Sequence, residues 1–296
     1  MVKDKVVVGI DVGTSKIATI IGKVGDGVIN VIGVSEVKAS GMRKGQIVDI
    51  EEAMQSINSS LESAERMAGT SISSSFVSIG GSHVESQNSH GIVAVADPDR
   101  EITAEDVRRV IEAARAISLS SSREILHVLA RGFVVDGEAG IKDPIGMTGV
   151  RLEVDTHIIT ANLTSVRNLI KAVSEVGVDV AGVVFGGLAS SLTVLSETEK
   201  ELGVVLVDLG AGTTDICIFI EGALSYSSVL PIGARHITND LAIGLRVSLE
   251  SAEKIKLHLG EKQKRPVLPA QVTDRLDEEM GEIGRTSGEK PDELDL

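Results

Sequence analysis

The sequence contains a single cysteine, Cys217, among 296 residues. One thiol cannot form a disulfide within the chain, and the six histidines are scattered without the spacing of zinc ligands. Cys217 stands within an apolar run, so we expect a small core residue there and not a redox centre. The sequence therefore excludes a disulfide-stabilised class and favours the reducing cytoplasm.

Long apolar runs are also missing. No stretch approaches the roughly 18 apolar residues that cross a bilayer. The N-terminus has an acid among its basic residues, and Gly9 and Asp11 interrupt the apolar run that follows, which is not the pattern of a signal peptide. Any membrane contact is expected through a peripheral segment or a partner protein.

Clusters of Lys and Arg are absent too. The formal net charge is -14, and a general nucleic-acid binder needs grouped cations to neutralise phosphates. We therefore expect no nucleic-acid partner.

What the chain does contain is glycine and aliphatic residues: 31 glycines, 42% hydrophobic and 24% charged residues, a composition typical of an α/β protein. Its length allows two lobes with separate cores. Runs of β-branched residues at 6–10, 16–23 and 28–34, separated by glycine turns, predict a β-meander. Apolar residues three or four apart predict a helix over 50–67 that packs on this sheet, followed by a buried strand at 76–79.

Between about 82 and 159 the sequence becomes more polar. We expect loops around one helix, which begins at a capping-box pattern of Thr103 and Asp106, and two strands at 125–136 and 151–160. This stretch is interpreted as an inserted subdomain. The main fold is then expected to resume with a helix at 164–176, a strand at 180–185 and a helix at 187–195.

The strongest internal signal is a repeated acidic turn that carries glycines. Its two copies are Gly9-Ile-Asp11-Val-Gly13-Thr14-Ser15-Lys16 and Val207-Asp208-Leu-Gly210-Ala-Gly212-Thr213-Thr214-Asp215. Each lies between two apolar strands, and the second copy has strands at 204–208, 214–220 and 224–230. Such a duplication predicts two related lobes whose turns face each other across a cleft.

The residue types in these turns suit a nucleotide triphosphate. Glycines let backbone N–H groups approach phosphate oxygens, and the Thr and Ser hydroxyls add donors. Asp11 and Asp208, near the end of the first strand of each hairpin, can hold Mg²⁺ directly or through its waters, because that cation prefers oxygen ligands. Either turn alone is most often only a turn, whereas the matched pair favours a phosphate clamp. Neither copy is a Walker loop, because Gly-Lys-Ser/Thr followed by a helix is absent.

The two turns resemble the phosphate-1 and phosphate-2 motifs of the actin, Hsp70 and sugar-kinase superfamily. Within it the chain is similar to the FtsA family of bacterial cell-division proteins, from Val6 to about Gly260. The segments that carry this likeness are Gly41-Met-Arg-Lys-Gly45-Gln-Ile-Val-Asp49, Ser78-Ile-Gly-Gly-Ser-His83, Asn88-Ser-His-Gly91, Asp143-Pro-Ile-Gly-Met147 and Glu199-Lys-Glu-Leu-Gly203.

The resemblance implies an α/β, actin-like (ribonuclease-H-like) two-lobed ATPase fold that binds ATP and Mg²⁺. It places lobe 1A at 1–81 and 160–200, the inserted 1C subdomain at 82–159, part of lobe 2A at 201–247, and the start of lobe 2B with a polar tail at 248–296. The second lobe is then incomplete, and one edge of the 2A sheet is expected to be unpaired, with part of its apolar face uncovered.

The site residues follow from the clamp and the resemblance together. Gly233 lies in a segment similar to the family's Gly-Gly phosphate turn, although Ala234 stands where a second glycine is common. Glu253 and Lys256 resemble the pair that reaches the ribose and adenine, whereas alone they would be an exposed helical ion pair. No general base is evident, so at most a slow ATPase is expected. The expected nucleotide-binding residues are Asp11, Gly13, Thr14, Ser15, Lys16, Asp208, Gly210, Gly212, Thr213, Thr214, Gly233, Glu253 and Lys256, with Asp11 and Asp208 at Mg²⁺.

The resemblance also implies an adaptor at the cytoplasmic face of the inner membrane that tethers FtsZ filaments at the division site. It self-associates into filaments and meets later division proteins through 1C. FtsA chains continue further, so a truncated chain is expected, in which the FtsZ-tail site is partly missing and the terminal amphipathic membrane helix is absent. After Glu261 only a weak helical pattern remains, at Val272, Leu276, Met280 and Ile283.

Two alternatives stay open. The first is the related pilus-assembly adaptor PilM, although the segments around His83 and Asn88 favour FtsA. The second is a small-molecule kinase of the same superfamily. A kinase needs a substrate pocket with a base carboxylate, and the stretch 82–159 offers no evident one.

Overall fold

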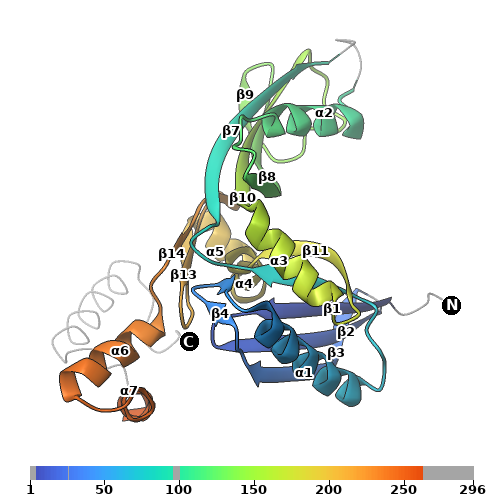
Figure 1. Cartoon of the computed structure of the whole chain (residues 1–296). Coiled ribbons are helices and arrows are strands. Elements are labelled where there is room, and N and C mark those ends of the chain that lie inside the picture. Colours follow the sequence, from blue (N-terminus) through green and yellow to red (C-terminus); the bar gives the residue numbers. More distant parts are fainter. Residues whose placement is uncertain (1–4, 26, 96–100, 263–296) are drawn as a thin grey trace, which may run out of the picture. The chain divides into compact units, whose positions relative to one another are not determined.

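The computed structural model describes residues 5–25, 27–95 and 101–262 (Figure 1). The chain divides into two compact units, Met1–His236 and Ile237–Leu296. Each unit is described by itself.

A five-stranded sheet with the order β11-β6-β1-β2-β3 opens the first unit. The first three strands form an antiparallel meander, and β6 and β11 continue the sheet in parallel with β1. The predicted meander is therefore confirmed. The strands are β1 (Lys5–Val12), β2 (Lys16–Gly25), β3 (Val28–Lys38), β6 (Ser74–Ile79) and β11 (Asp179–Phe185).

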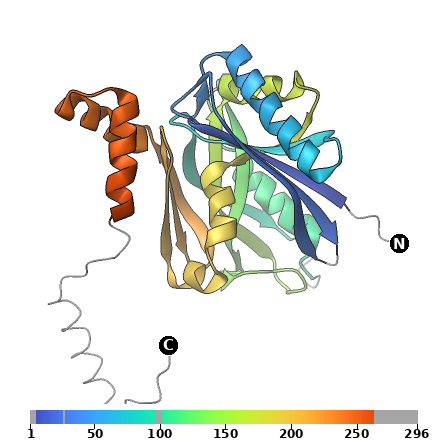
Figure 2. The same cartoon turned by 90° about the horizontal axis from the view of Figure 1, so that it is seen from below.

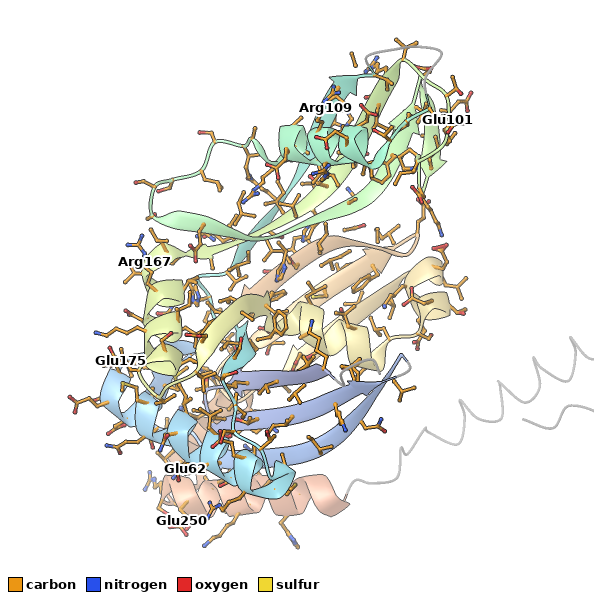
Figure 3. The ribbon with its side chains drawn as sticks, turned by 90° about the vertical axis from the view of Figure 1, so that its right-hand side faces the viewer. Glu62, Glu101, Arg109, Arg167, Glu175 and Glu250 are labelled. Atoms are coloured by element: carbon orange, nitrogen blue, oxygen red, sulfur yellow. The ribbon has the colours of Figure 1, made fainter. Side chains whose placement is uncertain are left out.

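Helix α1 (Ile50–Ala68) lies along one face of this sheet, with α3 (Leu163–Ser174) beside it (Figures 1 and 2). The Asp49 side chain caps the start of α1 by accepting from the backbone of Glu52, and Gly69 ends it in the left-handed conformation. The apolar stripe of α1 is buried in the core, while Glu62 of α1 and Arg167 of α3 point outward (Figure 3). The helix predicted over 50–67 is confirmed.

A four-stranded sheet with the order β7-β10-β8-β9 is covered on one face by α2 (Ala104–Arg115). The predicted capping box is confirmed, because Thr103 and Asp106 bond each other's backbone N–H groups. The sheet and helix enclose a core of their own. Its strands are β7 (Glu85–Ala94), β8 (Arg123–Val135), β9 (Glu138–Ile141) and β10 (Arg151–Asn162).

The interpretation of residues 85–94 as polar loop is wrong. They form β7, whose ten residues pair with β10 in unbroken antiparallel register. The run Glu85 to His90 has no β-branched residue and no apolar alternation, so its local propensity gives no strand signal. Pairing with β10, far along the chain, overrides that propensity.

The last sheet of the first unit has three antiparallel strands, β12 (Val204–Leu209), β13 (Thr214–Ile220) and β14 (Ala223–Leu230). Helices α4 (Gly186–Val194) and α5 (Glu197–Leu202) precede it and contact it. All three strands were predicted. No described strand pairs with the outer edge of β12, and Val205, Val207 and Leu209, which share one face of this strand, are exposed.

Two further elements complete the described chain. A short hairpin of β4 (Met42–Arg43) and β5 (Gln46–Ile47) leads into α1. Helices α6 (Ala234–Leu245) and α7 (Leu249–Lys262) follow β14. The helical pattern expected at Val272 to Ile283 lies outside the described residues. None of the described helices is long and apolar enough to cross a membrane.

Candidate functional site

Two turns of the same geometry join β1 to β2 and β12 to β13. In the first, the N–H of Gly13 donates to the carbonyl of Lys16 over 3.0 Å, and in the second the N–H of Gly210 donates to the carbonyl of Thr213 over 2.9 Å. A Cβ atom on Gly13 or Gly210 would lie 2.9 or 3.0 Å from that same carbonyl oxygen. The sequence repeat is therefore a structural repeat, with glycine required at the same point of both turns.

The structure brings these two turns together. Gly212 of the second turn lies against Thr14 of the first, since a Cβ atom there would come within 2.9 Å of Thr14 Oγ1. Thr14 Oγ1 also accepts a hydrogen bond from the backbone of Gly45 over 2.9 Å, which leaves the Thr14 hydroxyl its own hydrogen to donate. Residues far apart in the sequence thus place two sets of turn amides side by side.

Three carboxylates gather at these turns: Asp11 near the end of β1, Asp208 near the end of β12 and Asp215 at the start of β13. Asp208 and Asp215 are direct partners in the antiparallel pair, so their side chains stand on the same face. Asp215 is buried, and its burial, then the charges of Asp208 and Asp11, raise its pKa to about 7. The three acids therefore act on one another electrostatically.

The partners of these acids are neutral groups. Ser78 donates its hydroxyl to Asp11 Oδ1, and Ser190 donates to Asp208 Oδ2 over 2.7 Å. The Asp215 carboxylate accepts from the backbone of Gly187, and its Oδ1 atom is buried without a hydrogen-bond partner. Among the ion pairs of the described residues, none includes any of the three acids. Within the described residues, no positively charged side chain therefore forms an ion pair with this cluster.

This cluster fits Mg²⁺ held with a ligand, and it does not fit a metal held by side chains alone. In the described part of the chain, no three His, Cys, Asp or Glu side chains are close enough to hold a metal ion. Mg²⁺ takes one or two carboxylates in such sites and completes its shell with waters and phosphate oxygens. The unpartnered Oδ1 of Asp215 is an acceptor for such a water.

The remaining turn residues have varied surroundings. Ser15 and Lys16 are exposed, and Lys16 Nζ pairs with Glu36 at 3.1 Å. That exposed pair is of small energetic worth and can open at little cost. Thr213 supplies its carbonyl to the turn. Thr214 donates its hydroxyl to the carbonyl of Ile232 over 2.7 Å, so the Thr214 hydrogen is used within the protein.

Gly233 packs against the backbone of the second turn. A Cβ atom on Gly233 would lie 2.5 Å from the carbonyl oxygen of Gly210, so no larger residue fits. The N–H groups of Ala234 and Arg235 donate to the carbonyls of Gly210 and Ala211, each over 2.9 Å. The segment after β14 is thereby fastened to the second turn.

In the second unit, Glu253 and Lys256 join α7 to Thr238 of α6. Lys256 Nζ lies 2.7 Å from Glu253 Oε2, and both side chains bond the Thr238 hydroxyl. This arrangement is the helical ion pair that the spacing alone would give. The expected contact of Glu253 and Lys256 with ribose and adenine stays a prediction.

Sequence reasoning missed Asp215, Ser78 and Ser190 as members of the site. Asp215 is the last residue of the second copy of the repeated motif. The matching position of the first hairpin is Ala18, so comparing the two copies does not indicate that Asp215 belongs to the site. Its position directly across from Asp208 was the available signal. Ser78 and Ser190 carry no local signal, because only the tertiary fold places them beside the two acids.

Two family models match the sequence. "SHS2 domain inserted in FTSA" matches residues 81–160, and "Cell division protein FtsA" matches residues 205–292. Relatives with the name cell division protein FtsA are 44% identical over 254 residues in Pseudomonas aeruginosa and 46% identical over 255 residues in Borreliella burgdorferi. Each match covers 86% of this chain, and 60% and 62% of the relative. The chain thus spans less than two thirds of the length of these relatives.

The fold is shared with solved structures. A chain of the PilM-PilN type IV pilus biogenesis complex is similar with a TM-score of 0.64 at 15% identity, over 94% of this chain and 77% of that chain. A likeness at this identity concerns the fold alone. The chain has the actin-like α/β fold that the sequence predicted.

Proposed function

Because the chain belongs to the FtsA family of bacterial cell-division proteins, we propose that it binds Mg²⁺-ATP at its paired turns and acts as a cytoskeletal adaptor of division. The observation that carries the nucleotide proposal is the contact of Gly212 with Thr14 beside three carboxylates without a cationic partner. A triphosphate with its metal supplies both the phosphate oxygens and the positive charge that this arrangement accommodates.

The residues divide into donors and metal-facing acids. The turn amides and the Thr14 hydroxyl would donate to phosphate oxygens, and Lys16 would add positive charge once released from Glu36. Asp11, Asp208 and Asp215 would face Mg²⁺ and its waters, and the bound ion would offset the phosphate charge. Ser78 and Ser190 hold two of these carboxylates in place.

Hydrolysis is proposed to be slow or incidental. Among the buried side-chain atoms without a partner in the described chain, Asp215 Oδ1 is the one carboxylate oxygen, and it lies with the acids proposed to face the metal. That oxygen is therefore assigned to the metal site and not to a general base.

Membership of the family supports the wider role as a proposal. The adaptor would bind the C-terminal tail of FtsZ, self-associate into filaments and meet later division proteins through the SHS2 region, at the cytoplasmic face of the inner membrane. In this scheme the five-stranded sheet with α1 and α3 belongs to lobe 1A, the four-stranded sheet is the 1C subdomain, and the three-stranded sheet belongs to lobe 2A. Membrane contact would depend on a terminal amphipathic helix of the kind that FtsA chains carry.

A second candidate is an adaptor of the PilM type, since a chain of the PilM-PilN complex shares the fold and the fold does not separate the two roles. A pull-down separates the two. We expect the 296-residue chain to retain an FtsZ C-terminal tail peptide in preference to a PilN peptide. Retention of the PilN peptide alone would move the protein to pilus assembly. Release of ADP stimulated by a small metabolite would instead reveal a kinase.

A further inference from the structure

The four-stranded sheet contacts β14 of the three-stranded sheet (Figure 1). A polar seam lies at this contact, buried at His157, Ser225 and Ser227, partly buried at Ser86 and exposed at Asn88. His157 of β10 is 1% exposed at its centre. Its Nδ1 atom lies 2.7 Å from Asn88 Oδ1, and its Nε2 atom lies 2.9 Å from Ser227 Oγ. Asn88 Nδ2 donates to the carbonyl of Ser225 over 3.2 Å, and the Ser86 hydroxyl donates to the carbonyl of Ser227 over 2.7 Å. We call these five residues the seam.

The directions of the two hydrogen bonds of His157 follow from the amide donor of Asn88. Because the amide nitrogen of Asn88 donates to Ser225, the amide oxygen faces His157 and can only accept. Nδ1 of His157 therefore carries the hydrogen, and Nε2 accepts from the Ser227 hydroxyl. Burial, then the charge of Arg131, lowers the pKa of His157 to about 4, so the ring is neutral at pH 7. None of the side-chain atoms of the seam is among the buried atoms without a partner.

A set of hydrogen bonds in which every group has a partner fixes the alignment of the two sheets more than it raises the free energy of unfolding. Apolar side chains of similar size would hold two sheets together at least as strongly. The seam differs because its bonds are directional, and a shift of β14 by one residue along β7 would break the bonds of Asn88, His157 and Ser86 together. The seam therefore sets where β14 lies.

The C-terminal end of β14 lies next to the second turn, which joins β12 to β13. Two residues after the strand, the carbonyl of Ile232 accepts from Thr214, and Gly233 packs against the carbonyl of Gly210. The next amide, that of Ala234, donates to Gly210 as well. A displacement of β14 is thereby passed to the turn that carries Gly210 and Gly212.

The four-stranded sheet also contacts the five-stranded sheet, because the backbone N–H of Phe185 at the end of β11 donates to His127 Nε2 of β8 over 3.0 Å. Arg123 donates to the carbonyl of His83 over 3.0 Å and to Thr160, and pairs with Glu85 at 3.0 Å. Arg123 thereby joins β8 to β7, to β10 and to the segment at His83 that leads from β6 into β7. The four-stranded sheet is thus anchored at both of the sheets that supply the turns.

We propose that Asn88 and His157 are positioning residues for the nucleotide, because through β14 they hold the second phosphate turn in place against the first. The nucleotide part of this inference rests on the function proposed above. By thermodynamic linkage, a ligand that orders the second turn also orders the seam, and a change in the seam changes the affinity of the turn.

The test compares Asn88→Ala with Gln87→Ala, the preceding residue on β7, which is exposed like Asn88. Hydrogen exchange of the backbone amides and Mg²⁺-ATP affinity are measured on the full chain. For Asn88→Ala we expect exchange at residues 210–214 to rise by about tenfold, exchange at 13–16 to stay unchanged, and the Kd for Mg²⁺-ATP to rise by about tenfold, the scale of leaving the buried His157 ring without one hydrogen bond. Gln87→Ala should change none of these.

Ser227→Ala removes a single hydroxyl and serves as the second variant if Asn88→Ala does not fold. Increased exchange confined to β7 and β14, with the 210–214 turn unchanged, overturns the positioning role. If the unaltered chain fails to bind Mg²⁺-ATP, the proposed function is wrong, and the exchange at 210–214 still decides whether the seam positions the turn.

Discussion

Replacing Asp208 with alanine is expected to weaken Mg²⁺-ATP binding by about 10- to 100-fold, the usual scale for removing a metal-facing group or its support. Asp208 stands directly across from Asp215, and Ser190 fixes one of its oxygens at 2.7 Å. Its removal takes away a metal-facing carboxylate and leaves the turn backbone intact. Titration calorimetry with ATP, in the presence and absence of Mg²⁺, measures the effect, and the loss should disappear when Mg²⁺ is omitted.

Cys217→Ser is the matched control for Asp208→Ala. Cys217 lies on β13, two residues beyond Asp215, and is fully buried. Burial, then the charges of Asp215 and Asp208, raise the pKa of its thiol to about 12, so the thiol is not ionised near pH 7. The control should bind Mg²⁺-ATP as the unaltered chain does. Equal titrations for the two variants would show that the acids of the site are wrongly assigned.

Asp215→Asn is expected to stabilise the nucleotide-free protein while it weakens Mg²⁺-ATP binding. The pKa of Asp215 is raised from 3.8 to about 7 in the folded protein. Between these values the folded state binds more protons than the unfolded state, so the contribution of Asp215 to stability falls as pH rises from about 4 to about 7. Asparagine cannot ionise and removes that loss.

Thermal unfolding without Mg²⁺ at pH 5 and pH 8 tests this sign. At pH 8 the Asp215→Asn variant should unfold at a temperature higher by about 5 °C, and the difference should shrink at pH 5. Because His83, His90, His127 and His157 are present in both proteins, their titrations cancel in the comparison. An asparagine variant that is less stable at pH 8 would mean that the ionised Asp215 is not destabilised by its burial and by its acidic neighbours.

The turns could be predicted from the sequence because their chemistry is local. Gly13 and Gly210 are required by a hydrogen bond to a residue three positions later, and Asp11 and Asp208 precede them at a fixed spacing. The boundaries of α1 could be predicted for the same reason, since Asp49 and Gly69 cap it from adjacent positions. Motifs whose residues interact with their neighbours along the chain can be predicted from the sequence before the fold is known.

The features that escaped prediction depend on residues far apart in the sequence. Asp215 becomes part of the site through its register with Asp208 and through the approach of Asp11 from the other sheet. The seam is a further case, because Asn88 and His157 meet Ser227 only after two sheets are placed side by side. Neither residue type nor spacing distinguishes Asn88 from any other asparagine before the two sheets meet.

The central claim is that the two acidic turns bind the same metal-bound phosphates, and a crystal structure with Mn²⁺ and a non-hydrolysable ATP analogue tests it most directly. Anomalous scattering locates the metal without reference to the protein. We expect a single Mn²⁺ peak facing both Asp11 and Asp208, with phosphate oxygens bonded to the amides of both turns. Phosphates bound at one turn only, or a metal position remote from either acid, would contradict the account.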